Sequence, residues 1–107
     1  MSTPAIFINC FEVPAGREEE FFALWSVVNR YMRRKPGFIS NRLHRATSAE
    51  ARFGFVNYVQ WRSVEDFRAA HDDGFRALVQ QAIWSDFPCS GAIYEIASEH
   101  AVDSITA

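Results

Sequence analysis

The sequence predicts an α+β fold whose strands and helices follow the order β-α-β-β-α-β. Four segments alternate apolar and polar residues as strands do, and two segments have the three-to-four-residue apolar spacing of helices. At 107 residues the chain is long enough for one small domain with a single core. This order is the ferredoxin-like pattern, an antiparallel sheet with both helices on one face. We expect one domain over 1–107, with an ordered core over 5–98 and a frayed tail over 99–107.

The first part of the chain predicts a strand followed by a long amphipathic helix. The strand is expected over 5–13 and ends at Pro14-Ala15-Gly16. In the helix expected over 17–34, apolar residues recur at spacings of four, three and four and form one face: Phe21, Trp25, Val28 and Met32. Acidic residues at 18–20 favour the positive N-terminal end of this helix. Pro36 ends it, because proline disfavours helical backbone in the preceding residue.

Two strands are expected next, over 38–46 and 52–61, with a polar turn at 47–51 between them. Alternation along the first of these strands places Phe38, Ser40 and Arg42 on one face. Alternation along the second gives an apolar face interrupted by a single amide: Phe53, Phe55, Asn57, Val59 and Trp61. Because a buried amide is costly without a hydrogen bond, Asn57 needs a partner from the protein, water or a ligand.

The last part of the chain predicts a capped helix and a final strand. Ser63 is the expected N-cap, with Asp66 at the capping-box position and an inward-facing set of apolar residues: Val64, Phe67 and Ala70. Asp72-Asp73-Gly74 is expected to break this helix, which resumes over 75–83. The final strand is expected over 91–98.

Composition excludes several classes of function. The net charge is −2, and basic residues are scattered apart from Arg33-Arg34-Lys35, so nothing favours nucleic-acid binding. No segment approaches the ~18 consecutive apolar residues of a membrane helix. Cys10 and Cys89 lie far apart and are expected to be buried, reduced thiols. No metal-ligand spacing is present. We therefore expect a cytoplasmic protein without a metal site.

The sheet face away from the helices needs a cover. It is expected to present a second set of side chains: Ile6, Ile8, Cys10 and Tyr58. The simplest cover is the same face of a second copy, so the pattern predicts a symmetric homodimer.

Three motifs carry a resemblance to a known family: Glu-Val-Pro-Ala-Gly at 12–16, Pro-Gly-Phe at 36–38 and Val-Asn-Tyr-Val-Gln-Trp at 56–61. With them the chain resembles, from Ile6 to about Ile96, the antibiotic biosynthesis monooxygenase (ABM) domains, whose fold is the dimeric α+β barrel. The third motif is similar to a strand of the cofactor-free anthrone monooxygenases of aromatic polyketide pathways.

The resemblance implies a substrate class and a chemistry. The substrate would be a small flat aromatic compound, phenolic, anthrone-like or quinone-like. It would be deprotonated and would react directly with O2, without flavin or metal. Asn57 would donate to the substrate oxygen or peroxide, and Trp61 would hold the polycycle. A tyrosine of the subgroup falls on Phe67 here. Its later arginine has Arg76 and Gln81 as the nearest positions.

Three residues are therefore predicted to be catalytic: Asn57, Trp61 and His71. His71 is included because an ordinary pKa near 6.5 suits a general base at neutral pH. Seven others are predicted to bind the substrate: Asn9, Phe7, Phe11, Phe55, Phe67, Trp25 and Arg76. Structural roles stay open for these residues, since strand amides and tryptophans often serve the core or an interface.

Three other functions stay open. An isomerase or cyclase could use His71 or Arg42 for proton transfer. A ligand-binding dimer could have no turnover. The heme-degrading branch of the family also resembles the chain, with Asn9 matching its first-strand asparagine. Its tryptophan and histidine positions fall on Ala70 and near Val79.

Overall fold

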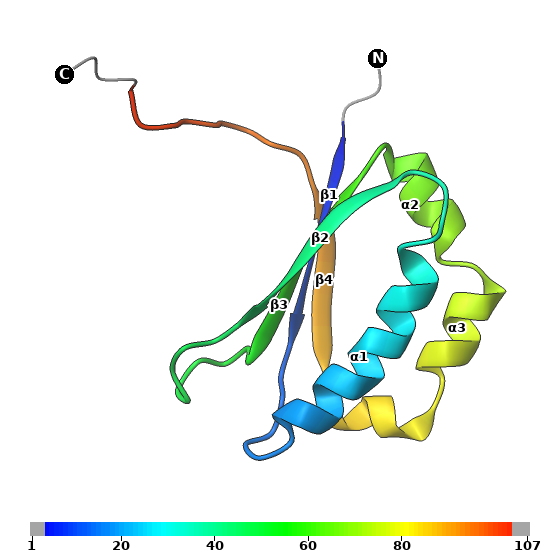
Figure 1. Ribbon diagram of the computed structural model, residues 1–107, viewed down its shortest axis with the longest axis vertical. Coiled ribbons are helices and arrows are strands. Elements are labelled where there is room, and N and C mark those ends of the chain that lie inside the picture. Colours follow the sequence, from blue (N-terminus) through cyan, green and yellow to red (C-terminus); the bar gives the residue numbers. More distant parts are fainter. Residues whose placement is uncertain (1–3, 104–107) are drawn as a thin grey trace.

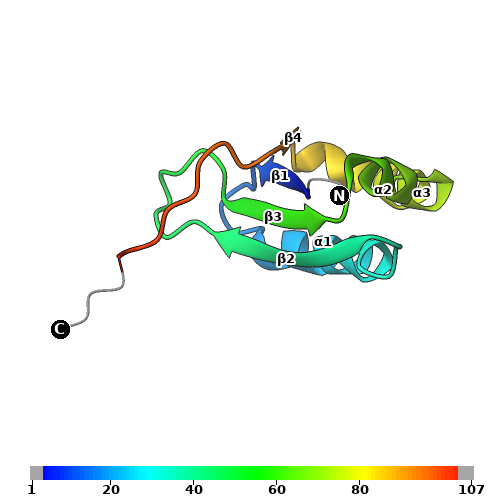
Figure 2. The same cartoon turned by 90° about the horizontal axis from the view of Figure 1, so that it is seen from above.

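The structure is a computed structural model, and it describes residues 4–103. Its elements are β1 (Ala5–Phe11), α1 (Glu18–Met32), β2 (Phe38–Arg45), β3 (Phe55–Trp61), α2 (Val64–Ala70), α3 (Asp73–Val79), a 3₁₀ turn (Ala82–Asp86) and β4 (Cys89–Tyr94). The strands pair antiparallel in the order β2-β3-β1-β4. Figure 2 shows this order, and Figure 1 shows the helices on one side of the sheet. The predicted ferredoxin-like α+β fold is confirmed.

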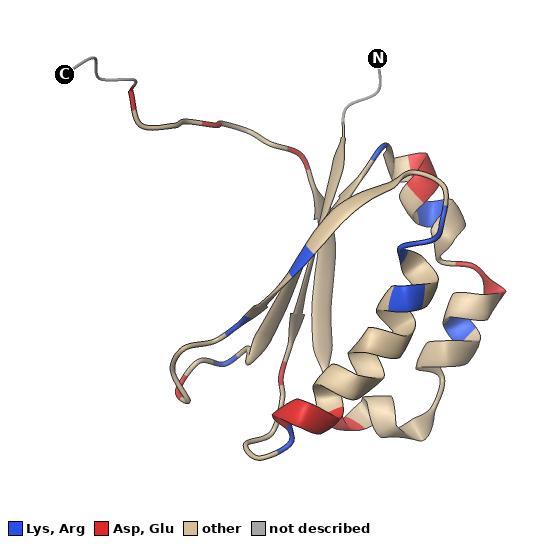
Figure 3. Ribbon diagram, viewed as in Figure 1, with Lys and Arg blue, Asp and Glu red and all other residues tan. Residues whose placement is uncertain are grey.

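Helix ends follow the charges and caps in the sequence. α1 has Glu18, Glu19 and Glu20 in its first turn and Arg30 in its last, as the colours of Figure 3 show. The predicted cap of α2 is confirmed, because Ser63 Oγ accepts a hydrogen bond from the Asp66 backbone N–H at 3.1 Å. α2 ends at Ala70, so the break falls at His71 and Asp72 rather than over the predicted Asp72-Asp73-Gly74. α3 runs over Asp73–Val79, so the predicted resumption over 75–83 is wrong at both ends. Asp72 caps α3 by accepting from the Phe75 backbone N–H at 3.0 Å.

The final strand is shorter than predicted. β4 runs over Cys89–Tyr94, starting two residues before the expected strand and ending four residues before its end. Residues 95–103 form no strand or helix and lead away from the sheet (Figure 1). The residues of β4 that precede the expected start include Cys89, which is exposed; the prediction that it is buried is wrong. No helix among residues 4–103 is long and apolar enough to span a membrane.

A β-bulge at Ile39 sets the face of each later residue in β2. Phe38 pairs with Trp61 and Ser40 pairs with Gln60, so Ile39 is an extra residue between them. Phe38 therefore faces the helices, while Ser40 faces the opposite side. The prediction that these two residues share a face is wrong. The bulge also places Asn41 on the helix side, opposite Val59.

The core between sheet and helices is divided into two apolar clusters. One contains Ala5, Met32, Val59, Trp61 and Ala70, and the other contains Phe11, Phe21, Phe55 and Phe87. Asparagines separate them on both central strands. Asn9 lies between Phe7 and Phe11 on the helix side of β1, and its register partner Asn57 lies between Phe55 and Val59 on β3. The apolar core therefore has a polar layer at its middle.

Candidate active site

A cavity of about 490 Å³ lies between the sheet and the helices. Eight of the predicted site residues line it: Phe7, Asn9, Phe11, Trp25, Asn57, Trp61, Phe67 and His71. They come from β1, α1, β3 and the α2–α3 segment, so every layer of the fold supplies part of the wall. The volume falls within the range of small-molecule sites, and the lining is mostly aromatic with a few polar groups, as such sites usually are.

His71 is held in one tautomer at the junction of α2 and α3. Its Nδ1 lies 2.7 Å from the carbonyl oxygen of Phe67. A carbonyl only accepts, so Nδ1 carries the proton and Nε2 keeps its lone pair. The ring packs between Phe67 and Phe75, with ring centroids 4.2 and 4.6 Å away. Burial among these aromatic rings lowers the pKa of His71 below its ordinary value, which makes the imidazole a neutral base at pH 7.

Asp72, although adjacent in sequence, is committed to other partners. Its carboxylate accepts from Tyr31 Oη at 2.7 Å and pairs with the Lys35 ammonium. The hydrogen bond from Lys35, with that from Tyr31, holds the pKa of Asp72 well below its ordinary value. His71 therefore forms no Asp–His pair with Asp72, and its ring is held by the Phe67 carbonyl and by the neighbouring rings of Phe67 and Phe75.

The asparagines of the two central strands meet at the cavity. Asn57 is 9% exposed, and its Oδ1 accepts from Asn41 Nδ2 at 3.2 Å. Asn9 lies directly across from it, with an Oδ1 that is buried and has no partner among the described residues. On the other side of Asn9, Gly91 leaves the room that this carboxamide needs. A Cβ on Gly91 would lie 2.9 Å from Asn9 Oδ1 and 2.8 Å from the Phe7 ring.

Trp61 closes the cavity at the end of β3. It is 2% exposed and meets Phe38 and Phe67 edge to face, with centroids 5.5 and 6.2 Å away. Its indole Nε1 is buried and has no partner among residues 4–103. A buried donor without a partner costs about 1–3 kcal/mol. Trp61 Nε1 and Asn9 Oδ1 are thus a buried donor and a buried acceptor without a hydrogen-bond partner among the described residues.

Two predicted substrate-binding residues lie away from the cavity. Phe55 is buried in the second core cluster, where its ring lies 4.9 Å from Phe21. Arg76 has a side chain that is 58% exposed and forms an ion pair with Asp73 at 2.7 Å. The earlier start of α3 accounts for this, since it places Asp73 one turn before Arg76 on the outer surface.

Other wall residues escaped the sequence analysis. They include Asn29 on α1, Phe75 and Val79 on α3, and Trp84 and Phe87 beyond it. Asn29 had a recognisable signal, because it follows Trp25 by four residues and so places an amide on an apolar helix face. Trp84 and Phe87 had none, because the 3₁₀ turn that brings them to the cavity follows from tertiary contacts with Phe21.

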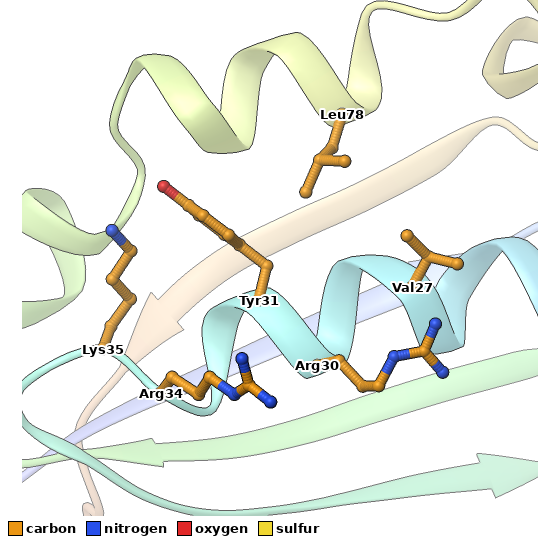
Figure 4. A pocket seen from close by; sticks show the side chains of 6 residues that line it. All are labelled: Val27, Arg30, Tyr31, Arg34, Lys35 and Leu78. Carbon is orange, nitrogen blue, oxygen red and sulfur yellow. The ribbon is translucent and has the colours of Figure 1, made fainter.

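A second hollow of about 480 Å³ lies between α1 and α3 (Figure 4). Its walls are Val27, Arg30, Tyr31, Arg34, Lys35 and Leu78. It opens on the outer surface, where Val27 is 44% exposed. Lys35 is already paired with Asp72, and Arg30 and Arg34 stand at the helix C-terminus, where positive charge is favourable in any helix. These features need no ligand to explain them. Within residues 4–103 no cluster of three or more His, Cys, Asp or Glu could hold a metal ion.

The family model described as antibiotic biosynthesis monooxygenase matches residues 4–81, which contain α1, the three strands before α2 and most of the cavity wall. The chain belongs to the ABM family. The resemblance seen in the sequence motifs is thereby confirmed.

This ABM protein is similar to three known proteins. It is 38% identical over 74 residues to the tetracenomycin-F1 monooxygenase of Streptomyces glaucescens, an alignment that spans 66% of this chain and 63% of that one. It is 28% identical to a protein of Shewanella loihica PV-4 provisionally named a monooxygenase, with a TM-score of 0.77 over 92% of this chain and 99% of that one. SnoaB, a cofactor-independent oxygenase of Streptomyces nogalater, shares the fold at 22% identity, with a TM-score of 0.77 over 95% and 100% of the two chains.

Proposed function

We propose that this ABM protein is a cofactor-independent oxygenase that inserts one atom of O2 into a small flat phenolic compound of the anthrone type. The observation that carries the proposal is a neutral His71 base in an aromatic cavity with an unpartnered donor and acceptor. The tetracenomycin-F1 monooxygenase, 38% identical, supports the same class of reaction.

The reaction balances without any added reductant. His71 Nε2 takes a proton from the activated methylene group of the substrate, which leaves a carbanion delocalised onto the phenolic ring and its oxygen. The carbanion gives electrons to O2 and forms a carbon–oxygen bond, so that protonation yields a hydroperoxide. Loss of the remaining C–H proton and cleavage of the O–O bond give a carbonyl and water. The substrate supplies all four electrons, since one methylene group and one O2 become one carbonyl group and one water.

The cavity residues have distinct proposed roles. Asn57 donates to the oxygen on which negative charge develops, and Trp61 Nε1 donates to a second oxygen of the substrate. Asn9 accepts from a substrate hydroxyl. The rings of Phe7 and Phe67, whose centroids lie 4.8 Å apart, form a wall that suits a flat polycycle. In this scheme Phe67 needs no hydroxyl, because polar contacts come from the asparagine layer.

We also propose a cytoplasmic homodimer. On the sheet face away from the helices, Ile6 is only 3% exposed, so the prediction that it needs a cover is wrong. On the same face Ile8 and Tyr58 are half-buried and Tyr94 is 51% exposed, and Figures 1 and 2 show the helices on the opposite side of the sheet. A second copy of this face would bury them. The free thiols of Cys10 and Cys89 suit a reducing compartment. Sedimentation velocity tests the dimer.

Oxygen consumption with a panel of anthrones and hydroquinones tests the reaction. We expect uptake of one O2 per substrate, formation of the quinone, and no product under nitrogen. Product formed under nitrogen would instead identify an isomerase or cyclase that uses the same His71 base. No uptake above the buffer rate with any member of the panel would contradict the oxygenase for this substrate class.

The pH dependence of turnover should report the lowered pKa of His71. The neutral imidazole is the base, so activity is full above the pKa of the folded protein and falls as the pH drops through it. Because burial lowers this pKa below the ordinary 6.5, the acid limb of log(kcat/KM) should bend below 6.5. A substrate that does not ionise between about pH 5 and 8 is needed. A bend at or above 6.5 would contradict a neutral buried base.

A further inference from the structure

Three asparagines from three different elements are linked in a chain beside the cavity. Asn41 Nδ2 on β2 lies 2.9 Å from Asn29 Oδ1 on α1 and 3.2 Å from Asn57 Oδ1 on β3. An amide NH2 has two hydrogens, and here each of them meets one carboxamide oxygen. Asn41 is therefore a double donor, and its two neighbours are both acceptors toward it.

The two hydrogen bonds from Asn41 decide which polar groups of Asn29 and Asn57 stay available to other partners. When the oxygen of a carboxamide is turned toward Asn41, its NH2 must point elsewhere, because the two groups diverge from one carbon. Asn29 and Asn57 both line the cavity, whereas Asn41 does not. No hydrogen bond among residues 4–103 uses the Nδ2 of Asn57. Asn57 is thus left with a free donor.

We propose that Asn41 is a positioning residue that orients the Asn57 carboxamide with its NH2 available to the cavity. Asn41 touches no bound molecule itself. It acts by occupying the oxygen of Asn57, so that this side chain can meet a ligand only as a donor. The proposal rests on the proposed function for its catalytic meaning, because a fixed donor stabilises an oxyanion as it forms. The orientation of the Asn57 carboxamide by Asn41 does not depend on which reaction the protein catalyses.

The β-bulge at Ile39 makes this position possible. If β2 alternated strictly from Phe38 through Ile39 and Ser40, with no bulge, Asn41 would lie on the far face of the sheet. The contact with Asn29 then ties β2 to α1, so the orientation of Asn57 depends on a strand, a helix and a bulge together. The cost of the bulge, one unpaired backbone position, is offset by the hydrogen bonds that satisfy the amide oxygens of Asn29 and Asn57.

Exchange of side-chain amide protons, followed by NMR in the ligand-free protein, tests which of the three asparagines donates in these hydrogen bonds. We expect the NH2 of Asn41 to exchange at least about ten-fold more slowly than that of Asn57, which is the equivalent of one net hydrogen bond. In Asn41→Asp the carboxylate can only accept, so both neighbours should turn to donate to it and the NH2 of Asn57 should become the slow one. Asn29→Asp is the matched control. It adds the same charge to the same cluster, but it still accepts from Asn41, so exchange at Asn57 should stay fast.

Turnover measures the consequence for catalysis. Asn41→Asp should lower kcat by about 100-fold, the cost of losing one oxyanion donor, with a much smaller change in KM. Asn29→Asp should lose at least about ten-fold less activity, because Asn41 would still donate to both of its neighbours. Thermal unfolding of both variants checks that they remain folded. Fast exchange at Asn41 in the wild type, or equal effects of the two variants on Asn57 exchange, would overturn the proposal. If exchange inverts as expected while no anthrone is turned over, the positioning role stands and the oxygenase proposal fails.

Discussion

Replacing His71 by glutamine is expected to lower oxygen-dependent turnover by about 10²- to 10⁴-fold, the range that a positioned general base contributes. Glutamine can still donate a hydrogen bond toward the Phe67 carbonyl, 2.7 Å from Nδ1 in the wild type, but it has no basic nitrogen to take the place of Nε2. The fall should appear mainly in kcat, and the acid limb of the pH profile should disappear with it. Steady-state oxygen uptake across a pH series measures both effects.

His44→Gln is the matched control for this variant. His44 is exposed on β2, and its Nδ1 also lies near a backbone carbonyl, that of Val56 at 3.3 Å, so the substitution makes the same chemical change outside the cavity. Its turnover should stay within about two-fold of the wild type. Full activity of His71→Gln would show that another group, or the substrate itself, handles the proton.

Phe21→Ala should destabilise the fold by about 3–5 kcal/mol, the usual cost of deleting a fully buried aromatic ring. Phe21 is 0% exposed and forms the centre of the second core cluster. Its ring centroid lies 4.8 Å from that of Phe11 and 5.5 Å from that of Phe87. Removing the ring leaves a cavity beneath the sheet that these neighbours fill only in part. Urea unfolding at one fixed protein concentration measures the loss.

The adjacent residue offers a control with the same change in chemistry. Phe22 is 52% exposed, so Phe22→Ala should change the free energy of unfolding by less than about 1 kcal/mol. Since Phe87 also lines the candidate active-site cavity, Phe21→Ala should weaken binding of the proposed substrate as well. Equal destabilisation by the two substitutions would contradict the assignment of Phe21 to the centre of the cluster.

Local signals in the sequence were enough for the four strands, the helical segments and their order, but not for the 3₁₀ turn at Ala82–Asp86. The spacing of Phe21 and Met32 predicted α1, and Ser63 predicted the start of α2 to the residue. The ends of helices and strands that lack a strong local signal were predicted less accurately. The break at His71 depends on the capping of α3 by Asp72, which also binds Tyr31 and Lys35 from α1 and the turn after it. Those partners lie about forty positions away along the chain, beyond the reach of propensity.

The sequence by itself determined that an amide sits among aromatic residues on β3, and that Asn9, Asn57, Trp61 and His71 are the polar groups to consider. Alternation along a strand fixes the face of such a residue once the strand is known. Only the tertiary structure decided what Asn57 is bonded to. The bulge at Ile39 reverses the alternation in β2, and the partner Asn41 reaches the cavity side for that reason alone. A bulge depends on how two strands pair, and pairing is a property of the folded sheet, which no local pattern encodes.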